Sequence, residues 1–231
     1  FQYVSSKLGN ENSKKEYHNS IFGKVEDNWF YFFSKAHQYC QYADYINLNQ
    51  NSVVINCGVE YGSELKLFNG AHTIYNIDPG SDKNLDENVK YLIKDTTTKN
   101  IFLDYALYTL NGIYTPKEQN HNTKNQIKVK NLKEIINEHK ISKIDLIKSD
   151  IEGAERYMVD DLIDICLKHN TQLAISIYHT NNKKNFDEVL YDYVDIPEKI
   201  INKLEKTYNF FIKHYCYERW ELIFYAIPKF M

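Results

Sequence analysis

Arginine is nearly absent from this sequence: of its 28 lysine and arginine residues, only Arg156 and Arg219 are arginine. Because the planar guanidinium fork is the side chain that holds phosphate through two parallel hydrogen bonds, bidentate phosphate clamps are scarce. No dense basic block with interleaved aromatic residues occurs either, and the formal net charge is -3. This balance argues against a dedicated nucleic-acid surface, so we expect no nucleic-acid partner.

Paired cysteines and long apolar runs are also missing. The four cysteines form no C-x-x-C pair, so the sequence indicates neither a zinc site nor a disulfide framework, and we expect no metal. No uninterrupted apolar run reaches transmembrane length, and the first residues lack the charged start and apolar stretch of a signal peptide. We therefore expect a cytoplasmic protein without a membrane span. The chain begins with Phe1 rather than Met, as a piece of a longer protein would.

The composition, 43% hydrophobic and 26% charged, is typical of a globular enzyme, and 231 residues suit one α/β domain. We assign residues 1–50 to an N-terminal helical extension and residues 51–231 to the α/β domain. Residues 1–27 are polar and predict a loosely held lead-in. An aromatic stripe at spacings of three and four then predicts an amphipathic helix that packs on the sheet or joins two copies as a homodimer; its members are Trp29, Phe32, Phe33, Ala36, Tyr39, Cys40 and Ala43.

A strand, a glycine loop and an acid follow one another in the first part of the α/β domain. The segment 52–63 predicts a short strand and a loop containing Gly58 and Gly62, with a helix from Glu64. The next strand, 73–77, ends at Asp78, which lies 20 residues after Gly58, the distance at which an acid bonds ribose hydroxyls. The order predicts an adenosine pocket. The Gly58-x-x-x-Gly62 spacing differs from the dinucleotide fingerprint and so disfavours a nicotinamide cofactor.

The stretch 144–155, IDLIKSDIEGAE, joins an apolar strand to a cluster of acids, and Gly153 permits a sharp turn into the next helix. At a period of two, Lys148, Asp150 and Glu152 share one side, beyond the carboxyl end of a strand, where open α/β sheets bind ligands. A structural interpretation stays open. Lys148 can neutralise Asp150, and Glu152 or Glu155 can stabilise the start of the helix.

The remaining elements follow from periodicity and turn residues. We predict helices at 82–89, 131–139, 156–168 and 197–206, strands at 101–107 and 173–178, an exposed loop at 110–126, a polar loop at 180–195, and a C-terminal antiparallel hairpin formed by YNFFIKHY and ELIFYAIP. His179 directly follows the strand 173–178. Its ordinary pKa suits proton transfer, although a histidine there can also cap the strand through a hydrogen bond.

The stretch 144–155 resembles the iDllKiDvEGaE signature of FkbM-type S-adenosylmethionine-dependent methyltransferases. The glycine loop is similar to the vDvGAn.G of that family, and an acid-proline pair, Asp78-Pro79, follows the second strand. Asn56 stands where the family usually has Asp, and Asp78 where Glu is commoner. The resemblance covers residues 50–228. It implies a Rossmann-like methyltransferase fold with a sheet of seven strands and S-adenosyl-L-methionine as cofactor.

The resemblance also implies roles for individual residues. His179 is expected to act as general base, with Asp150 orienting the substrate or the base and Glu152 supporting it. The expected cofactor-binding residues are Asn56, Gly58, Gly62, Asp78, Tyr105, Ala106 and Asp150. Tyr105 and Ala106 are included because FLDYAL resembles the segment of the family that lines the adenine. Lys148, His179 and His214 are expected to bind the substrate, with His214 and Glu221 matching the family's final H...E..fYa pattern.

The implied activity is O-methylation of a sugar or nucleotide-sugar intermediate of surface polysaccharide (capsule) biosynthesis, on a hydroxyl or on a carboxylate that becomes a methyl ester. Three alternatives stay open. A nicotinamide-dependent sugar oxidoreductase would share the ribose acid, and a non-catalytic partner subunit of the same fold would be consistent with Asn56. A metal-assisted methyltransferase would use Asp150, Glu152 and His179 as ligands.

Overall fold

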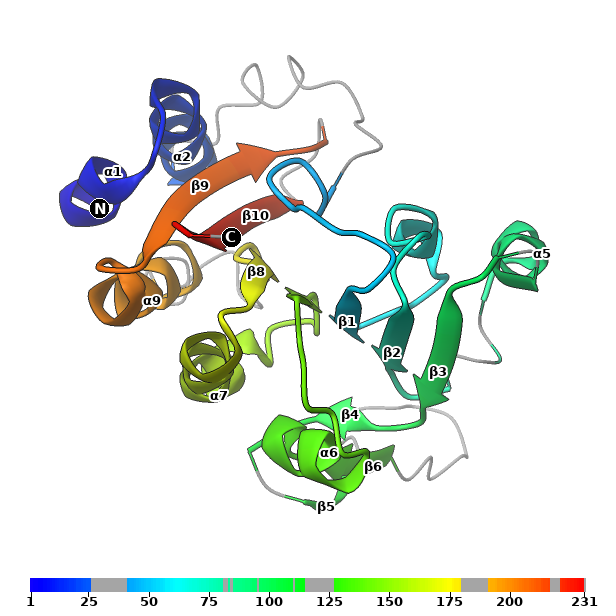
Figure 1. Ribbon diagram of the computed structural model, residues 1–231. Helices are drawn as coiled ribbons and strands as arrows, with labels where there is room; N and C mark the ends of the chain where they lie inside the picture. Colours follow the sequence, from blue (N-terminus) through cyan, green and yellow to red (C-terminus); the bar gives the residue numbers. More distant parts are fainter. Residues whose placement is uncertain are drawn as a thin grey trace.

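A seven-stranded sheet runs through the protein, shown in a computed structural model (Figure 1). The structure describes residues 1–25, 41–80, 83, 85–94, 96–109, 111–114, 127–179, 191–216 and 221–230. In spatial order the strands are β3 (Lys99–Leu103), β2 (Thr73–Ile77), β1 (Val53–Cys57), β7 (Leu146–Ser149), β8 (Gln172–Ser176), β10 (Leu222–Pro228) and β9 (Tyr208–His214).

The first five strands of this order are parallel, and β10 pairs antiparallel with both β8 and β9. The predicted α/β class and C-terminal hairpin are therefore confirmed. From β1 the chain proceeds outward through β2 to β3 and then returns to place β7 on the other side of β1. The strand order thus reverses between β1 and β7, which is the position where open α/β sheets bind ligands.

The central strands are buried on both faces, as the apolar runs in the sequence predict. All four residues of β7 are buried, and Val54 and Ile55 of β1 have no exposed surface. Parallel strands covered by helices on both sides need such continuous apolar sequence. Ile144 is also buried, although it lies before the first paired residue of β7.

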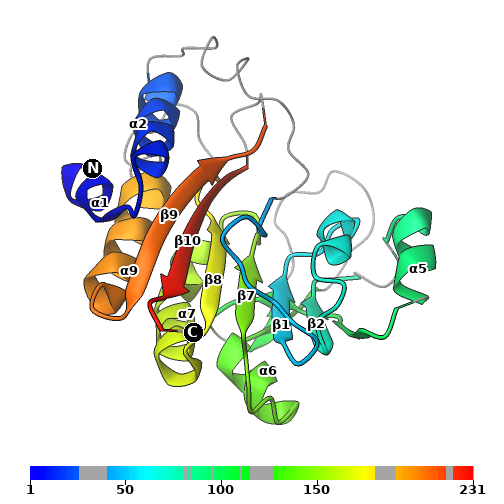
Figure 2. The ribbon, with the colours of Figure 1, turned by 45° about the horizontal axis from the view of Figure 1, so that its top comes forward.

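Helices cover the half of the sheet that contains β8 and β10 (Figure 2). α7 (Glu155–His169) packs on β8, and α9 (Ile196–Leu204) packs on α7 and β10. Pro197 occupies the first turn of α9, where its missing N–H breaks no helical bond. α6 (Leu132–Glu138) begins at Asn131, whose side chain accepts the backbone N–H of Lys133. The predicted helices at 131–139, 156–168 and 197–206 are confirmed.

The predicted strand 101–107 is divided between two sheets. β3 ends at Leu103, because Tyr105 N donates to Leu103 O at 2.9 Å and turns the chain. β4 (Ala106–Leu107) then joins a second sheet of order β4-β6-β5, with β5 (Gly112–Tyr114) and β6 (Ile127–Lys130). The expectation of a loop over 110–126 is therefore wrong at β5, and residues 115–126 lie outside the described residues.

Two other helix predictions need correction. The helix expected from Glu64 is a single 3-10 turn, η1 (Ser63–Lys66). Of the helix expected over 82–89, residues 82 and 84 lie outside the described part of the chain, and α5 (Glu87–Lys94) extends beyond the expected end. Before the first of these segments the chain turns, because Gly62 has a left-handed backbone, with φ of +74°. Most of the predicted aromatic helix falls on residues 26–40, outside the described part of the chain, and residues 41–45 form turns.

The N-terminal residues are not a loosely held lead-in. They form α1 (Gln2–Lys7) and α2 (Glu11–Val25); α2 lies against the edge strand β9, and α1 packs against α9 and α2 (Figure 1). Val4 and Tyr17 have no exposed surface, and the Tyr17 hydroxyl donates to Tyr193 O at 2.7 Å. Of the polar residues that suggested disorder, Asn12 and Lys15 are exposed to solvent, whereas Ser13 is buried. Among the described segments, no helix combines the length and apolar character needed to cross a lipid bilayer.

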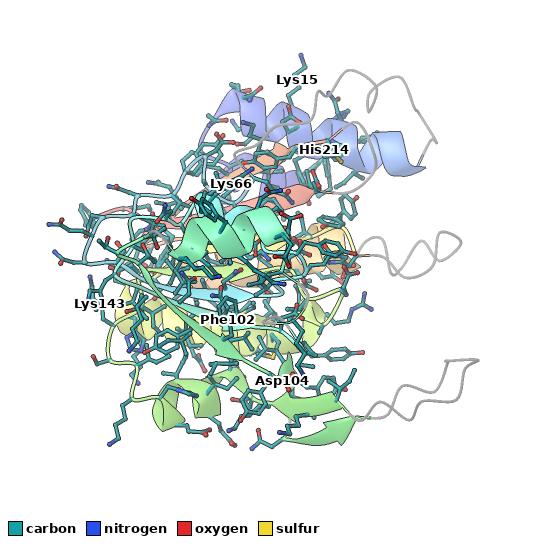
Figure 3. All side chains as sticks on the ribbon, turned by 90° about the vertical axis from the view of Figure 1, so that its right-hand side faces the viewer. Lys15, Lys66, Phe102, Asp104, Lys143 and His214 are labelled. Carbon is teal, nitrogen blue, oxygen red and sulfur yellow. The ribbon has the colours of Figure 1, made fainter. Side chains whose placement is uncertain are left out.

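Replacing Tyr17 with alanine tests this packing. The ring stacks on Phe1 with centroids 5.2 Å apart, so we expect Tyr17→Ala to lower the free energy of unfolding by about 3–5 kcal/mol. Urea denaturation measures the change. Lys15→Ala on the same helix is the control, since Lys15 points into solvent (Figure 3), and it should cost less than about 0.5 kcal/mol. Equal, small effects of both substitutions would show that the segment is loosely held after all.

Candidate active site

A cleft of about 770 Å³ opens where the carboxyl ends of β1, β2 and β7 meet. Of the residues predicted to bind the cofactor, Gly58, Asp78, Tyr105, Ala106 and Asp150 line this cleft. Lys148 and Glu152 line it as well, so the glycine loop and the acidic stretch meet in one place. The volume is in the range of small-molecule and cofactor sites.

Gly58 allows the glycine loop and the end of β7 to touch. Its φ is +79°, and a Cβ at this position would lie 1.6 Å from the carbonyl oxygen of Asp150. Asp150 N in turn donates to Cys57 O at 3.0 Å. Only glycine permits both the left-handed backbone and this approach. The requirement for Gly58 thus comes from the contact with β7 as well as from any ligand.

Asp78 closes the glycine loop from the end of β2. Its Oδ2 accepts the backbone N–H of Val59 at 2.8 Å and of Glu60 at 3.3 Å. The carboxylate that was predicted to bind ribose therefore also fixes the loop. Both of these hydrogen bonds use Oδ2, and the role of Asp78 toward ribose remains a prediction.

Asn56 does not reach the cleft. It is fully buried, and its Nδ2 donates to Glu64 Oε1 at 2.9 Å and to Asn76 Oδ1 at 3.1 Å. Glu64 itself lines the cleft. The residue at position 56 therefore influences the cleft through Glu64. The Asn56 amide holds the Glu64 carboxylate by a hydrogen bond, whereas an aspartate at position 56 would repel it. The negative charge expected at position 56 is present at Glu64 instead.

Lys148 is 3% exposed and holds the glycine loop against β7. Its ammonium donates to Gly58 O and, at 3.4 Å, to Cys57 O, and it lies 3.7 Å from Glu64 Oε1. These contacts support the structural interpretation of Lys148, with Glu64 rather than Asp150 as its nearest carboxylate.

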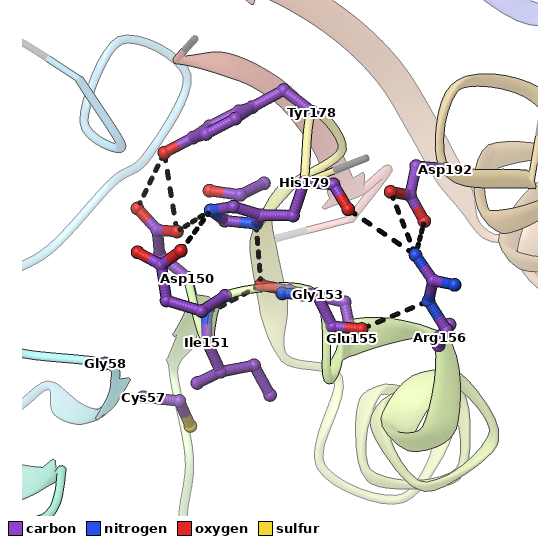
Figure 4. A network of polar contacts seen from close by, with 12 residues as sticks. Cys57, Gly58, Asp150, Ile151, Gly153, Glu155, Arg156, Tyr178, His179 and Asp192 are labelled. Carbon is purple, nitrogen blue, oxygen red and sulfur yellow. Dashed lines mark hydrogen bonds and ion pairs between the residues drawn. The ribbon is translucent and has the colours of Figure 1, made fainter. Parts of the chain in front are cut away.

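The acidic stretch forms a tight turn between β7 and α7 (Figure 4). Glu152 and Gly153 both have left-handed backbones, with φ of +55° and +91°. The carboxylate of Glu155, only 2% exposed, accepts Ile151 N at 2.6 Å and Gly153 N at 2.8 Å. Glu155 thus stabilises the turn itself. The Glu152 side chain remains 90% exposed at the surface of the cleft.

His179 lies between two carboxylates (Figure 4). Its Nε2 is 3.1 Å from Asp150 Oδ1, its Nδ1 is 3.5 Å from Glu155 Oε1, and Glu152 Oε2 is 3.8 Å from Nε2. Burial lowers the pKa of His179, but the hydrogen bonds to Asp150 and Glu155 outweigh it and raise the pKa to about 10. At neutral pH the ring is therefore an imidazolium.

Asp150 shows the opposite shift. Burial raises the pKa of Asp150, but the hydrogen bond from His179 and the charge of Lys148 outweigh it and hold the pKa well below its usual range. The hydroxyls of Tyr42 and Tyr178 also donate to its Oδ2, the latter at 3.2 Å. Asp150 is thus a carboxylate surrounded by donors.

Sequence reasoning missed several of these partners. Tyr42 lies more than a hundred residues from Asp150 in the chain, and no local pattern pointed to it. Arg156 donates from Nε to Gly153 O at 3.2 Å and from Nη2 to His179 O at 3.4 Å, and it pairs with the buried Asp192 at 3.3 Å. The rarity of arginine in the sequence was the only signal for this residue.

Four predicted site residues are not among those that line the cleft: Asn56, Gly62, His179 and His214. Gly62, with φ of +74°, precedes η1, and a Cβ there would lie 2.6 Å from Leu85 Cδ2, so its role is to shape the loop. His214 is 2% exposed at the end of β9, where it pairs with Leu222 of β10. Its assignment as a substrate-binding residue remains a prediction.

Asp150, Glu155 and His179 bring potential metal-ligand atoms within 4.8 Å of one another. Both oxygens of Glu155 accept backbone N–H groups, and both ring nitrogens of His179 face carboxylates. A metal at this place would have to displace these hydrogen bonds. The geometry therefore favours the protonated ring in the position that a cation would take.

The family model of the methyltransferase FkbM domain matches residues 17–204. Among solved structures, methyltransferase FkbM from Methylobacillus flagellatus KT superposes with a TM-score of 0.77 at 17% identity, over 97% of this chain and 57% of that chain. A protein from Corynebacterium glutamicum superposes with a TM-score of 0.50 at 11% identity, over 100% of this chain and 95% of that chain. An rRNA methylase from Streptococcus thermophilus superposes with a TM-score of 0.48 at 12% identity, over 90% of this chain and 97% of that chain.

At these identities the structural likeness shows the fold alone, a Rossmann-like methyltransferase fold. This chain spans 57% of the length of the Methylobacillus flagellatus protein. No curated protein sequence matches the chain.

The raised pKa of His179 makes stability depend on pH. A group whose pKa rises from 6.5 unfolded to about 10 folded stabilises the protein fully below its unfolded pKa, and this contribution disappears as pH rises through the folded value. We expect the free energy of unfolding to decrease as the pH rises from 6.5 to about 10, by at most roughly 1.4 kcal/mol per pH unit. Urea denaturation over this range measures it.

His179→Gln should remove this slope, whereas His169→Gln should keep it, because His169 lies at the end of α7 away from the two carboxylates. If the two variants show the same slope as the unmodified protein, His179 is not held as an imidazolium.

Proposed function

This chain belongs to the FkbM methyltransferase family, and from that premise we propose that it transfers a methyl group from S-adenosyl-L-methionine to a hydroxyl of an uncharged sugar. Family membership favours methyl transfer over the nicotinamide-dependent alternative. The observation that supports the choice of acceptor is the charge of the cleft. Its lining includes six carboxylates, of Glu60, Glu64, Asp78, Asp150, Glu152 and Glu221, and two ammonium groups, of Lys66 and Lys148.

The cleft fits the cofactor by the chemistry of its donors. S-adenosyl-L-methionine, when bound, supplies a methyl group on a positively charged sulfonium. Asp78 at the end of β2 would accept ribose hydroxyls through Oδ1, and Tyr105 and Ala106 would bound the adenine. Glu64 and Asp150 would provide negative charge for the ammonium and the sulfonium.

The negative potential of the cleft is visible in one of its own acids. Burial, together with the nearby charges of Glu152 and Asp150, raises the pKa of Glu60. A cationic ligand relieves this repulsion, whereas an anionic one adds to it. Since Glu64 retains the charge that Asn56 lacks, the cleft also argues against a non-catalytic subunit.

The negative potential of the cleft also favours an uncharged acceptor over an anionic one. A nucleotide sugar brings a diphosphate into a cleft with three times as many carboxylates as ammonium groups, and Lys148 already donates to Gly58 O. An uncharged sugar avoids this repulsion, because its hydroxyls can donate to carboxylates. Tyrosine rings at Tyr61, Tyr105 and Tyr178 offer apolar faces for its C–H groups. The family resemblance suggests a sugar of surface polysaccharide biosynthesis.

His179 and Asp150 form the centre proposed for catalysis. Transfer to a hydroxyl needs alignment of donor and nucleophile and removal of the hydroxyl proton. His179 can take that proton only in its neutral form, so the pKa of about 10 means that the rate should rise with pH. Asp150 orients the ring through Oδ1, and Glu152 stands at its exposed side, 3.8 Å from Nε2.

The protonated state of His179 favours a second candidate acceptor, a carboxylate that becomes a methyl ester. Such a nucleophile is already ionised and needs no base. The six carboxylates of the cleft oppose its binding, however, because like charges repel in a partly buried site. We therefore place the uncharged hydroxyl first.

Calorimetric titration with S-adenosyl-L-methionine and S-adenosylhomocysteine tests the cofactor site. We expect binding by the unmodified protein and an affinity about 10 to 100 times lower for Asp78→Ala, since hydrogen bonds to an ionised group are lost. Asp104→Ala is the matched control. Asp104 accepts Gly80 N at 2.8 Å from the end of β3 and does not line the cleft, so this variant should bind normally. Unmodified protein that binds neither compound would refute the assignment.

Transfer of a labelled methyl group to acceptors of different charge tests the second half of the proposal. We expect neutral sugars to be methylated and the corresponding sugar phosphates and nucleotide sugars to react at least about tenfold more slowly, as one like-charge contact implies. With a hydroxyl acceptor, kcat/KM should rise with pH toward about 10, and His179→Ala should lower kcat.

With a carboxylate acceptor, no base is needed, and His179→Ala should raise KM more than it lowers kcat. A preference for phosphorylated acceptors would contradict the proposal. Activity that persists after treatment with a chelator would dismiss the metal-assisted variant.

A further inference from the structure

Tyr42 comes from a part of the chain that carries no predicted site residue, yet its phenol lies in the cleft. We propose that Tyr42 is a positioning residue of the methyl-transfer site, which holds the Asp150 carboxylate in place for the cofactor. The inference rests on the proposed function. Two observations support it: the hydrogen bonds of the Tyr42 hydroxyl, and the contacts that fix the backbone at and after Tyr42.

The Tyr42 hydroxyl uses its full hydrogen-bonding capacity. It donates to Asp150 Oδ2, it accepts from Gln41 Nε2 at 3.0 Å, and it lies 3.1 Å from Ser176 Oγ at the end of β8. Donors on the hydroxyl oxygen polarise its O–H bond and strengthen its own donation. Burial raises the pKa of Tyr42 well above 10, so this group remains a neutral donor at any working pH.

The two oxygens of Asp150 are thereby given different partners. Oδ2 accepts from Tyr42, Oδ1 lies 3.1 Å from His179 Nε2, and the Tyr178 hydroxyl lies 3.2 Å from Oδ2 and 3.4 Å from Oδ1. The orientation of the carboxylate plane follows from these contacts. The face of the Tyr42 ring also lies 4.9 Å from the Lys148 ammonium, which in turn donates to Gly58 O. Tyr42 therefore touches both walls that the cofactor must contact.

The backbone at Tyr42 is strained, and contacts on both the sheet and the hairpin hold it. Its φ is +69°, a left-handed conformation that is unusual for an aromatic residue, and its N–H donates to Tyr225 Oη at 3.1 Å. Tyr45 stacks on Phe211 with centroids 4.3 Å apart.

Further along the same segment, Asn47 and Gln172 exchange two hydrogen bonds of 2.8 Å. Among the residues that the structure describes, six non-glycine residues have left-handed backbones, and four of them line this cleft, namely Tyr42, Glu60, Glu152 and Glu221. Strain of this kind persists only where surrounding contacts determine it, and it gathers at functional sites.

Tyr42→Phe removes one hydroxyl and keeps the ring. Measured by calorimetry, the affinity for S-adenosyl-L-methionine should fall about tenfold, the effect of one hydrogen bond to an ionised group. In the methyl-transfer assay, the factor by which kcat decreases should exceed the factor by which the KM for the acceptor increases. Thermal unfolding reports the structural contribution separately.

Tyr17→Phe is the matched control, since it also removes a buried phenol hydrogen bond, here to Tyr193 O between α2 and η2 (Tyr191–Asp195). It should lower the melting temperature to a similar extent and leave both affinity and kcat unchanged. If Tyr42→Phe changes only the melting temperature, the hydroxyl is structural and the inference falls. If the unmodified protein does not bind the cofactor, the proposed function falls first, and the two failures are thus distinguishable.

Discussion

The placement of His179 between Asp150 and Glu155 is the interaction on which the rest of the site depends. Asp150 directly follows β7, Glu155 begins α7, and His179 follows β8, so one ring joins three elements. Two carboxylates this close would repel each other strongly in a half-buried site, and the imidazolium between them removes that cost. The turn through Glu152 and Gly153 can then keep the backbone conformation that faces the cleft.

This arrangement creates a cleft whose carboxylates outnumber its ammonium groups, and its chemistry follows from that imbalance. A methyl donor that carries a sulfonium and an ammonium suits such a cleft, and a neutral acceptor suits it better than an anion. Lys148 does not offset the imbalance toward a ligand, because its ammonium donates to the carbonyls of Cys57 and Gly58. The scarcity of arginine in the sequence has the same consequence, since no guanidinium fork lines the described cleft.

How far the sequence could go differs from residue to residue. Gly58, Asp78 and Asp150 could be found because each follows a strand within a short, recognisable pattern, and the structure places all three in the cleft. Asn56 was assigned by its place in such a pattern, but the side chain points into the sheet toward Asn76. Tyr42 could not be found, because its contact with Asp150 joins segments distant in sequence and depends on a left-handed backbone.

The sequence by itself determined the class of the fold, the motif that turns from β7 into α7, and the family to which the chain belongs. Each of these is encoded locally, in apolar runs, glycine positions and the spacing of acids. Only the tertiary structure decided that α2 packs on β9 and α1 on α9, and that Asn56 holds the Glu64 carboxylate at the cleft. It also decided that His179 is protonated. Burial and proximity set these properties, and both arise only when distant segments pack together.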